Sequence, residues 1–283
     1  MIKKEIISTV IPTFNRESFL KDAIISCLNQ TIKHEIIVCN HGGTDGTDIM
    51  VKQFQNKIKY IKKDIDYGPH FCWLDGIMQA TGEYINILFD DDWIKPNFIE
   101  QCMKYFNKDV GFVFTNAEIF DDSIKQSTKK IHDKFITKSG IYNVSQYEFY
   151  FLRFLISPTS IIIRKKDVID SLFQGKLPFA KNTYKGVGPD RLMILLCILR
   201  YKKFGYVSED LSVYREHINS ITVDSYSNHK KKKQIKEAYN EVVNYYYTLK
   251  YGKYFSYLNN RLVIYSKYYI NLLFIKMINF FKL

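Results

Sequence analysis

Short apolar runs alternate with segments of helical spacing along the first hundred residues. The runs are rich in β-branched residues and end at glycine, proline or polar loops, which is typical of buried strands. They predict strands at Ile6–Ile11, Glu35–Cys39, Ile58–Ile61 and Tyr84–Phe89. Apolar residues three and four positions apart predict helices at Glu17–Gln30, from the loop after Asn40 to about Phe54, and at His70–Ala80. Such alternation over short connections favours a parallel sheet with helices on both faces.

The rest of the chain continues this pattern less regularly. It predicts helices at Pro96–Phe106, Ser145–Ile156 and Arg191–Tyr201, and strands at Val110–Thr115, Ser160–Arg164, Phe204–Val207 and Leu211–Tyr214. The polar stretch Glu118–Asn143 is longer than an ordinary connection and is expected to be an irregular binding excursion. Glycines and a proline in Gln174–Gly188 indicate a mobile loop.

Three consecutive carboxylates, Asp90 to Asp92, close the apolar run that begins at Tyr84. Adjacent like charges at the end of a buried strand repel one another and resist desolvation. A divalent cation such as Mg²⁺ or Mn²⁺ relieves that conflict, because hard cations bind carboxylate oxygens. The alternative is a solvated acidic turn before the helix that Pro96 opens. The carboxyl ends of parallel strands bind ligands in open α/β sheets, and two earlier loops converge on the same edge.

Composition narrows the partners and the compartment. Lys and Arg number 41 against 29 Asp and Glu, a formal net charge of +12 that would suit nucleic acid, anionic lipid or an acidic ligand. A nucleic-acid partner is not expected, since no recognition motif accompanies the charge. The five cysteines are odd in number and form no Cys-x-x-Cys pair, which indicates reduced core residues in a cytosolic protein. The first residues lead straight into a strand, so no signal peptide is expected.

Four segments carry a resemblance to a known family. They are Val10-Ile-Pro-Thr-Phe-Asn-Arg16, the loop after Glu35-Ile-Ile-Val38 with its glycines and threonines, Ala80-Thr-Gly-Glu-Tyr84, and the acidic triplet. Over residues 2 to 222 the chain resembles bacterial glycosyltransferase family 2. The resemblance implies the GT-A fold, a Rossmann-like mixed and mostly parallel sheet with helices on both faces. It also implies metal-dependent, inverting transfer from a nucleotide-sugar donor, most simply a uridine-diphosphate sugar, to a saccharide hydroxyl.

The resemblance also assigns roles to residues. The positions that match donor-binding elements are Pro12, Thr13, Phe14, Arg16, Asn40, His41, Asp66, Gly68, Asp90 and Asp91. Asp92 and His217 match the metal ligands, for Mn²⁺ or Mg²⁺, and Asp190 matches the base that deprotonates the acceptor. For Asp190 the alternative is a favourable acid in the first turn of a helix, behind a proline. For His217 it is a structural histidine.

Three positions depart from the family. Asn40-His41 stands where two acidic residues are usual, so uracil is compatible with the site but no longer implied. Phe89 replaces a frequent earlier aspartate and leaves the triplet intact. Pro189 replaces the usual glutamate before Asp190, which weakens the assignment of that base. Two alternative functions therefore stay open. The protein is a glycosyltransferase that uses a non-uridine donor, or it is a catalytically impaired module that binds a nucleotide or a sugar and recruits other proteins.

Composition changes near Asp224, and residues 223–283 are predicted to form a helical tail after a domain at 1–222. The segment Leu262–Phe281 is apolar and tyrosine-rich, but Lys267 and Lys276 are poorly placed for a spanning helix. Together with Lys230 to Lys233, this segment could dock on anionic lipid. Its apolar content is equally typical of an interface between subunits of an oligomer. We expect a peripheral protein at the cytoplasmic membrane face, with a lipid-linked or oligosaccharide acceptor.

Overall fold

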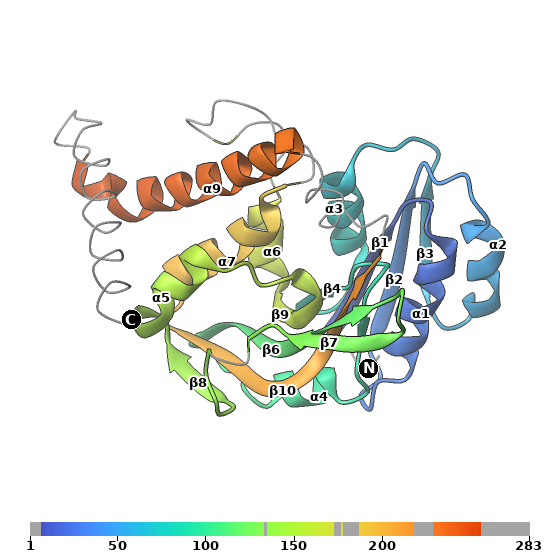
Figure 1. Cartoon of the computed structure of the whole chain (residues 1–283), viewed down its shortest axis with the longest axis horizontal. Helices are drawn as coiled ribbons and strands as arrows, with labels where there is room; N and C mark the ends of the chain where they lie inside the picture. The colour runs from blue at the N-terminus through green and yellow to red at the C-terminus, as the bar shows by residue number, and fades with distance from the viewer. Residues whose placement is uncertain (1–6, 133–134, 173–176, 178–186, 218–228, 256–283) are drawn as a thin grey trace.

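The computed structural model describes residues 7–132, 135–172, 177, 187–217 and 229–255 (Figure 1). These residues form a mixed ten-stranded sheet with the order β3-β2-β1-β4-β9-β6-β10-β5, in which β7 pairs with β6 and β8 with β10. The strands are β1 (Ile7–Thr13), β2 (Glu35–His41), β3 (Lys59–Lys63), β4 (Tyr84–Ile87), β5 (Trp93–Ile94), β6 (Val110–Asp121), β7 (Gln126–Lys130), β8 (Gly140–Asn143), β9 (Ile161–Arg164) and β10 (Lys203–Glu216).

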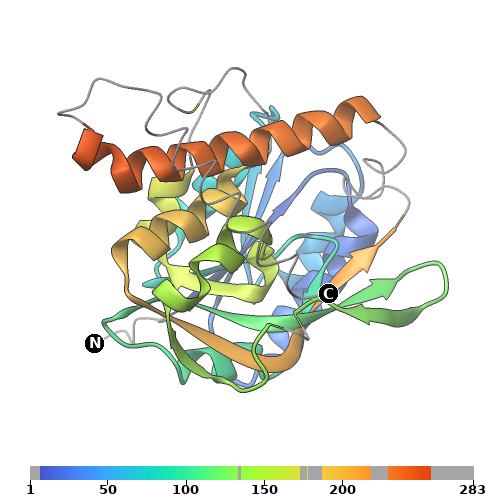
Figure 2. The same ribbon diagram turned by 60° about the vertical axis from the view of Figure 1, so that its left-hand side comes forward.

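Helices cover both faces of this sheet (Figures 1 and 2). The α-helices are α1 (Glu17–Leu28), α2 (Thr47–Val51), α3 (Pro69–Gln79), α4 (Phe98–Met103), α5 (Val144–Arg153), α6 (Lys165–Ser171), α7 (Pro189–Arg200) and α9 (His229–Phe255), with 3₁₀ turns at Lys52–Phe54 and Pro158–Ser160. The predicted α/β class with a mixed sheet is confirmed.

The alternation of side chains along the central strands explains the two layers. Val10 packs into the core on one face of β1, while Ile11 packs into the core on the other face. The β2 residues Ile37 and Val38 divide in the same way, as the period of two in a strand requires. Helices α3, α5 and α7 contribute to the first core, and α1 and α4 to the second.

Four neighbouring strands run parallel and set the position of the candidate site. β3, β2, β1 and β4 pair in parallel, with Thr13 opposite Asn40 and Val10 opposite Ile87. Their carboxyl ends therefore meet at one edge of the sheet. The acidic triplet, which follows β4, therefore lies at the same edge as the loops that follow β1 and β2.

Two predictions about the second half were wrong. Glu118–Asn143 is not an irregular excursion, because it contains the end of β6 and the strands β7 and β8. All five residues of β7 are exposed, so the polarity of this stretch reflects a solvated ribbon rather than a missing strand. The strands predicted at Phe204–Val207 and Leu211–Tyr214 are one strand, β10, whose pairing with β6 shifts register around Asp210. Such β-bulges interrupt the alternation without ending a strand.

The described part of the tail packs on the first core. Helix α9 lies along α7 (Figures 1 and 2), and its residues Ala238, Val242 and Tyr246 are buried at the four-residue spacing of one helix face. The domain boundary after residue 222 stays a prediction. The segment Leu262–Phe281 and most of Gln174–Gly188 lie outside the described residues. None of the helices within those residues is both long enough and apolar enough to cross a membrane.

Candidate functional site

The acidic triplet stands in a tight turn after β4. The Leu88 N–H donates to the Val10 carbonyl at 3.0 Å, and the Asp92 N–H donates back to the Phe89 carbonyl at 3.1 Å. These bonds extend the β1–β4 pairing by one residue and then reverse the chain. Asp90 and Asp91 are thereby presented to the end of β1 and the loop that follows it.

Asp90 is held by the last residue of β1 and by a residue of the loop after it. The Thr13 hydroxyl donates to one carboxylate oxygen at 2.8 Å, and the Arg16 guanidinium lies 3.2 Å from the other. Burial raises the pKa of Asp90 to about 6, although the charge of Arg16 opposes that rise and the charge of Asp91 adds to it. The repulsion between adjacent carboxylates that the sequence predicts is therefore present between Asp90 and Asp91.

Asp91 lies between two side chains from distant parts of the chain. Arg16 donates to its Oδ2 at 2.6 Å, and the Nε2 atom of His217 lies 3.1 Å from the same oxygen. Its side chain is 14% exposed, compared with 8% for Asp90. Asp91 is therefore the more accessible of these two carboxylates.

Both carboxylate oxygens of Asp92 have protein donors. The Thr159 hydroxyl donates to Oδ2 at 2.7 Å, and the Arg215 N–H donates to Oδ1 at 3.0 Å. Burial, and then the charge of Asp91, raises the pKa of Asp92 well above its usual range. His217 contacts Asp91 rather than Asp92, so the predicted ligand pair Asp92–His217 is not brought together by direct contact.

Arg215 is a central residue of this site that the sequence analysis missed. Its guanidinium donates to the Asp91 carbonyl at 3.1 Å, to Asp122 at 3.0 Å and to Asp22 at 2.6 Å. The guanidinium also lies 4.9 Å from the ring centroids of both Phe19 and Trp93. The side chain is only 9% exposed.

These contacts fix the end of β10 against the triplet turn, which brings His217 to Asp91. Arg215 belongs to the segment Tyr214-Arg-Glu-His217, but the family resemblance assigns a role only to the histidine of that segment. The partners of Arg215 lie too far away in sequence to be inferred from a local pattern.

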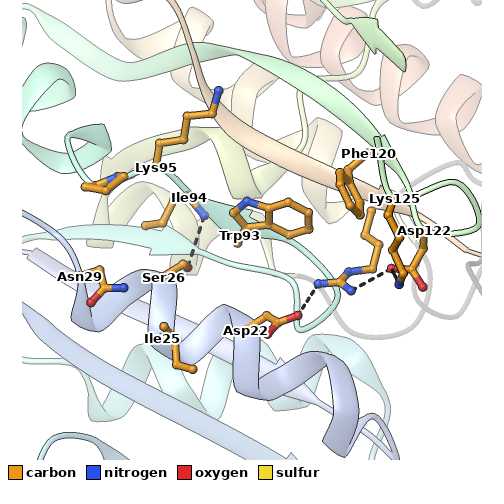
Figure 3. A pocket seen from close by; sticks show the side chains of 12 residues that line it. Asp22, Ile25, Ser26, Asn29, Trp93, Ile94, Lys95, Phe120, Asp122 and Lys125 are labelled. Carbon is orange, nitrogen blue, oxygen red and sulfur yellow. Dashed lines mark hydrogen bonds and ion pairs between the residues drawn. The ribbon is translucent and has the colours of Figure 1, made fainter. Parts of the chain in front are cut away.

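Arg215 is one of the residues that line a pocket of about 540 Å³, whose lining side chains are drawn in Figure 3. Figure 3 shows the Trp93 and Phe120 rings on one side of it, and the two ring centroids are 5.1 Å apart. Asp22 and Asp122, both partners of Arg215, also line the pocket. Arg215 therefore links this pocket to the backbone of the triplet turn.

Two further loops lie at the same sheet edge. Asn40 is buried; its amide donates to the Tyr60 hydroxyl at 2.9 Å and its carbonyl accepts the Gly43 N–H at 3.1 Å. A Cβ atom on Gly43 would lie 2.3 Å from the Asn40 Oδ1 atom, so a larger residue there would displace the Asn40 side chain. Asn40 thus shapes its own loop, a role that the sequence analysis did not anticipate. Its contact with a nucleobase stays a prediction.

The neighbouring loop residues are also engaged with one another. The His41 Nε2 atom lies 3.3 Å from Asp75, and its ring meets Tyr67 edge-on at 6.4 Å. Asp66 accepts the Gly68 N–H at 2.7 Å, and Gly68 has a φ of 91°, which favours glycine.

Among the donor-binding candidates, Phe14 presents a ring that is 48% exposed. Pro12, in β1, lies opposite Cys39. The five cysteines are free and buried, as predicted.

Asp190 is held at the start of α7, apart from the triplet. Its Oδ1 accepts the Arg191 N–H at 2.8 Å, and its Oδ2 accepts the Tyr239 hydroxyl of α9 at 2.8 Å. Burial raises the pKa of Asp190, and the hydrogen bond from Tyr239 opposes that rise. Within the described residues, its hydrogen-bond donors are Gly188 and Arg191 at the start of α7 and Tyr239 on α9, and none belongs to the triplet. The predicted base and the triplet are therefore not joined by direct contact.

The residues that could hold a cation are Asp91 and His217. Adjacent ligands of an octahedral ion with bonds of about 2.1 Å are roughly 3 Å apart. The 3.1 Å between Asp91 Oδ2 and His217 Nε2 matches that spacing. The described residues contain no group of three or more His, Cys, Asp or Glu side chains arranged to hold a metal. The site fits a divalent cation only if a ligand such as a diphosphate supplies the remaining oxygens.

Comparison with known proteins supplies the family. A Campylobacter jejuni GalNAc(5)-diNAcBac-PP-undecaprenol beta-1,3-glucosyltransferase is 35% identical over 118 residues, which cover 40% of this chain and 38% of that protein. The Bacillus subtilis minor teichoic acid biosynthesis protein GgaB is 28% identical over 216 residues, covering 74% of this chain and 23% of that protein. The match thus spans well under half the length of these curated relatives.

Solved structures share the fold at low sequence identity. Staphylococcus aureus TarS 1–349 in complex with UDP-GlcNAc has a TM-score of 0.60 at 15% identity, covering 90% of this chain and 76% of that one. The mannosyltransferase PcManGT from Pyrobaculum calidifontis, in complex with GDP-Man and Mn²⁺, has a TM-score of 0.52 at 11% identity, covering 96% of this chain and 81% of that one. The sequence model of glycosyl transferase family 2 matches residues 8–173, more than half of the chain. The chain therefore belongs to glycosyl transferase family 2.

Proposed function

We propose that this protein is a metal-dependent, inverting glycosyltransferase that extends a bacterial surface glycan. It transfers a sugar from a nucleoside-diphosphate donor to a hydroxyl of a saccharide. The observation that carries the proposal is the contact of Asp91 with both Arg16 and His217 at the carboxyl edge of the parallel strands. This arrangement brings a cation, a carboxylate and an imidazole to one point, which suits a diphosphate and its metal ion.

The donor is proposed to lie across the loops after β1 and β2. The exposed ring of Phe14 offers a face on which a nucleobase can stack. Arg16 is 25% exposed at its side chain, so its guanidinium can turn from the carboxylates toward a diphosphate. A uridine donor is favoured by the fold shared with TarS, whose structures contain UDP-GlcNAc and UDP. A guanosine donor is the alternative, since PcManGT was solved with GDP-Man.

We propose Asp91 and His217 as the metal ligands, in place of the predicted pair Asp92 and His217. Asp92 already accepts hydrogen bonds at both oxygens, and moving it would leave the Thr159 hydroxyl and the Arg215 N–H without their acceptor. Mn²⁺ or Mg²⁺, when bound, would neutralise charge on the departing diphosphate. Asp92 then serves to hold the turn on which Asp91 is presented.

The acceptor is proposed to be a lipid-linked saccharide at the inner face of the cytoplasmic membrane. The name of the Campylobacter relative specifies an undecaprenol-linked substrate. In this chain, Lys230, Lys232 and Lys233 are exposed at the start of α9, where they can meet anionic headgroups. Asp190 is proposed to accept the proton of the acceptor hydroxyl.

The function is tested by incubating the protein with a panel of UDP-, GDP- and TDP-linked sugars and Mn²⁺. We expect one donor to release its nucleoside diphosphate, and Asp91→Asn to stop that release. Asp109→Asn is the matched control, because Asp109 is exposed before β6, at the opposite sheet edge. Nucleotide binding without turnover of any donor would favour the recruiting module instead.

A chain that ends at Phe255 is expected to lose most of its binding to vesicles of anionic lipid. The cut removes the apolar segment Leu262–Phe281 but keeps α9, whose Val242 and Tyr246 belong to the core. Co-sedimentation with phosphatidylglycerol vesicles measures the effect, with phosphatidylcholine vesicles as the control. Light scattering reports the mass of both chains; a drop in mass would favour the oligomer interface. Unchanged sedimentation and mass would exclude both roles for the segment.

A further inference from the structure

A tyrosine of helix α9 contacts the proposed base. The Tyr239 hydroxyl donates to Asp190 Oδ2 at 2.8 Å, while the Arg191 N–H occupies Oδ1. The guanidinium of Arg191 lies 4.8 Å from the centroid of the Tyr239 ring. Both carboxylate oxygens and the tyrosine ring are therefore fixed, so Asp190 has one defined orientation.

Contacts other than the bond to Asp190 hold α9 against the rest of the protein. Ala238, Val242 and Tyr246 bury one face of the helix. The Tyr246 hydroxyl donates to Glu148 of α5 at 2.7 Å, and Lys250 pairs with the same carboxylate. A helix anchored in this way does not need a further polar contact at Tyr239, which suggests that this contact serves Asp190.

We propose that Tyr239 is a positioning residue that holds Asp190 oriented and ionised for proton transfer, an inference that rests on the proposed function. A hydroxyl that donates to a carboxylate stabilises its charged form, the form that accepts a proton. Burial and the charge of Asp190 raise the pKa of Tyr239, so its hydroxyl stays protonated and remains a donor.

Tyr239 assists a direct displacement at the anomeric carbon that needs only the donor and the acceptor. The acceptor hydroxyl gives its proton to Asp190, and its oxygen forms a bond to the anomeric carbon of the sugar. The bond from that carbon to the diphosphate breaks, and the electron pair leaves with the nucleoside diphosphate. Asp190 ends the step as a neutral acid, to which Tyr239 still donates.

In the described structure, the titratable groups with the largest effects on Asp190 are Tyr239 on α9 and Arg191 on α7. Helix α5 contributes a backbone carbonyl, that of Arg153, which accepts from the Arg191 guanidinium at 3.3 Å. A change at Tyr239 should therefore appear directly in the titration of Asp190.

Tyr239→Phe is expected to move the acid limb of the kcat/KM profile to higher pH, with the donor KM unchanged. Loss of a hydrogen bond to a charged group should lower kcat/KM on that limb by about tenfold or more. Tyr246→Phe is the matched control, because it deletes a hydroxyl-to-carboxylate bond on the same helix without touching Asp190. The control should keep the parent profile. The substrate is the nucleotide sugar turned over fastest in the panel.

An unchanged pH profile of kcat/KM for Tyr239→Phe would show that Tyr239 only helps to pack α9 against the protein. Asp190→Asn with normal turnover would instead take the base role away from Asp190, whereas failure to turn over any donor would overturn the proposed function. A measurement without turnover separates these outcomes further. In protein with ¹³C-labelled aspartate carboxyls, the resonance lost in Asp190→Asn identifies Asp190. Its titration midpoint should rise in Tyr239→Phe and stay in place in Tyr246→Phe; an unmoved midpoint in Tyr239→Phe overturns the proposal.

Discussion

Asp190→Asn is expected to slow sugar transfer by roughly 10²–10⁴-fold, the usual effect of losing a general base. Asparagine has nearly the same shape and can keep the hydrogen bond from the Arg191 N–H, but it cannot accept the proton of the acceptor hydroxyl. Folding and donor affinity should therefore survive. Initial transfer rates, nucleotide titration and thermal melting of this one variant give the three required measurements.

The competing role of Asp190 predicts the opposite pattern. An acidic residue in the first turn of α7 stabilises the helix by about 0.3–1 kcal/mol, so its loss would lower stability slightly and leave transfer near normal. Glu100→Gln provides the control, since Glu100 is a partly buried acid, with a side chain that is 43% exposed, in the first turn of α4. Transfer by Asp190→Asn within a few-fold of the parent would assign Asp190 to the helix alone.

Excess EDTA is expected to abolish transfer, and Asp91→Asn and His217→Ala should each remove the effect of Mn²⁺ on nucleotide binding. The site has two protein ligands, so the loss of either leaves only one. Losing an outer-shell partner of a metal ligand lowers metal affinity by roughly 10–100-fold. The loss of a direct ligand should lower the affinity for Mn²⁺ at least as much. Calorimetric titration of UDP with and without Mn²⁺ measures the effect. Full turnover in excess EDTA would refute the metal requirement.

Asp92→Asn separates the proposed ligand pair from the one predicted from sequence. Asp92 is buried and accepts from Thr159 and from the Arg215 N–H, so its replacement should mainly lower the melting temperature. Asp91 has partial exposure, and its replacement should mainly affect the metal ion. Loss of the Mn²⁺ effect in Asp92→Asn but not in Asp91→Asn would return the ligand role to Asp92.

The first half of the fold could be predicted because its pattern is local. The alternation of Val10 and Ile11 between two cores is visible as a strand buried on both faces, and short connections imply parallel pairing. Parallel pairing in turn places the ends of β1, β2 and β4 together. The convergence of Thr13, Arg16 and the triplet on one edge therefore followed from sequence, and the structure places them in contact.

The rest depended on contacts that no local pattern contains. Exposure made β7 resemble a loop, and a bulge made β10 resemble two strands. Which carboxylate of the triplet faces His217 depends on the turn geometry, which the order of three aspartates does not reveal. The bond between Tyr239 and Asp190 joins residues 49 positions apart on two different helices, so neither periodicity nor composition could indicate it.

The ion pair between Asp22 and Arg215 joins residues that are 193 positions apart in the chain. Closing so long a loop costs conformational entropy before the contact returns any stability, which makes folds of this kind slow to form. During synthesis, the strands β1 to β4 emerge first, and the triplet turn then lacks Arg215 and the N–H that satisfies Asp92. The candidate site is thus completed only when the strand that carries Arg215 inserts beside β6, so a truncated or stalled chain has the acidic turn without the residues that organise it.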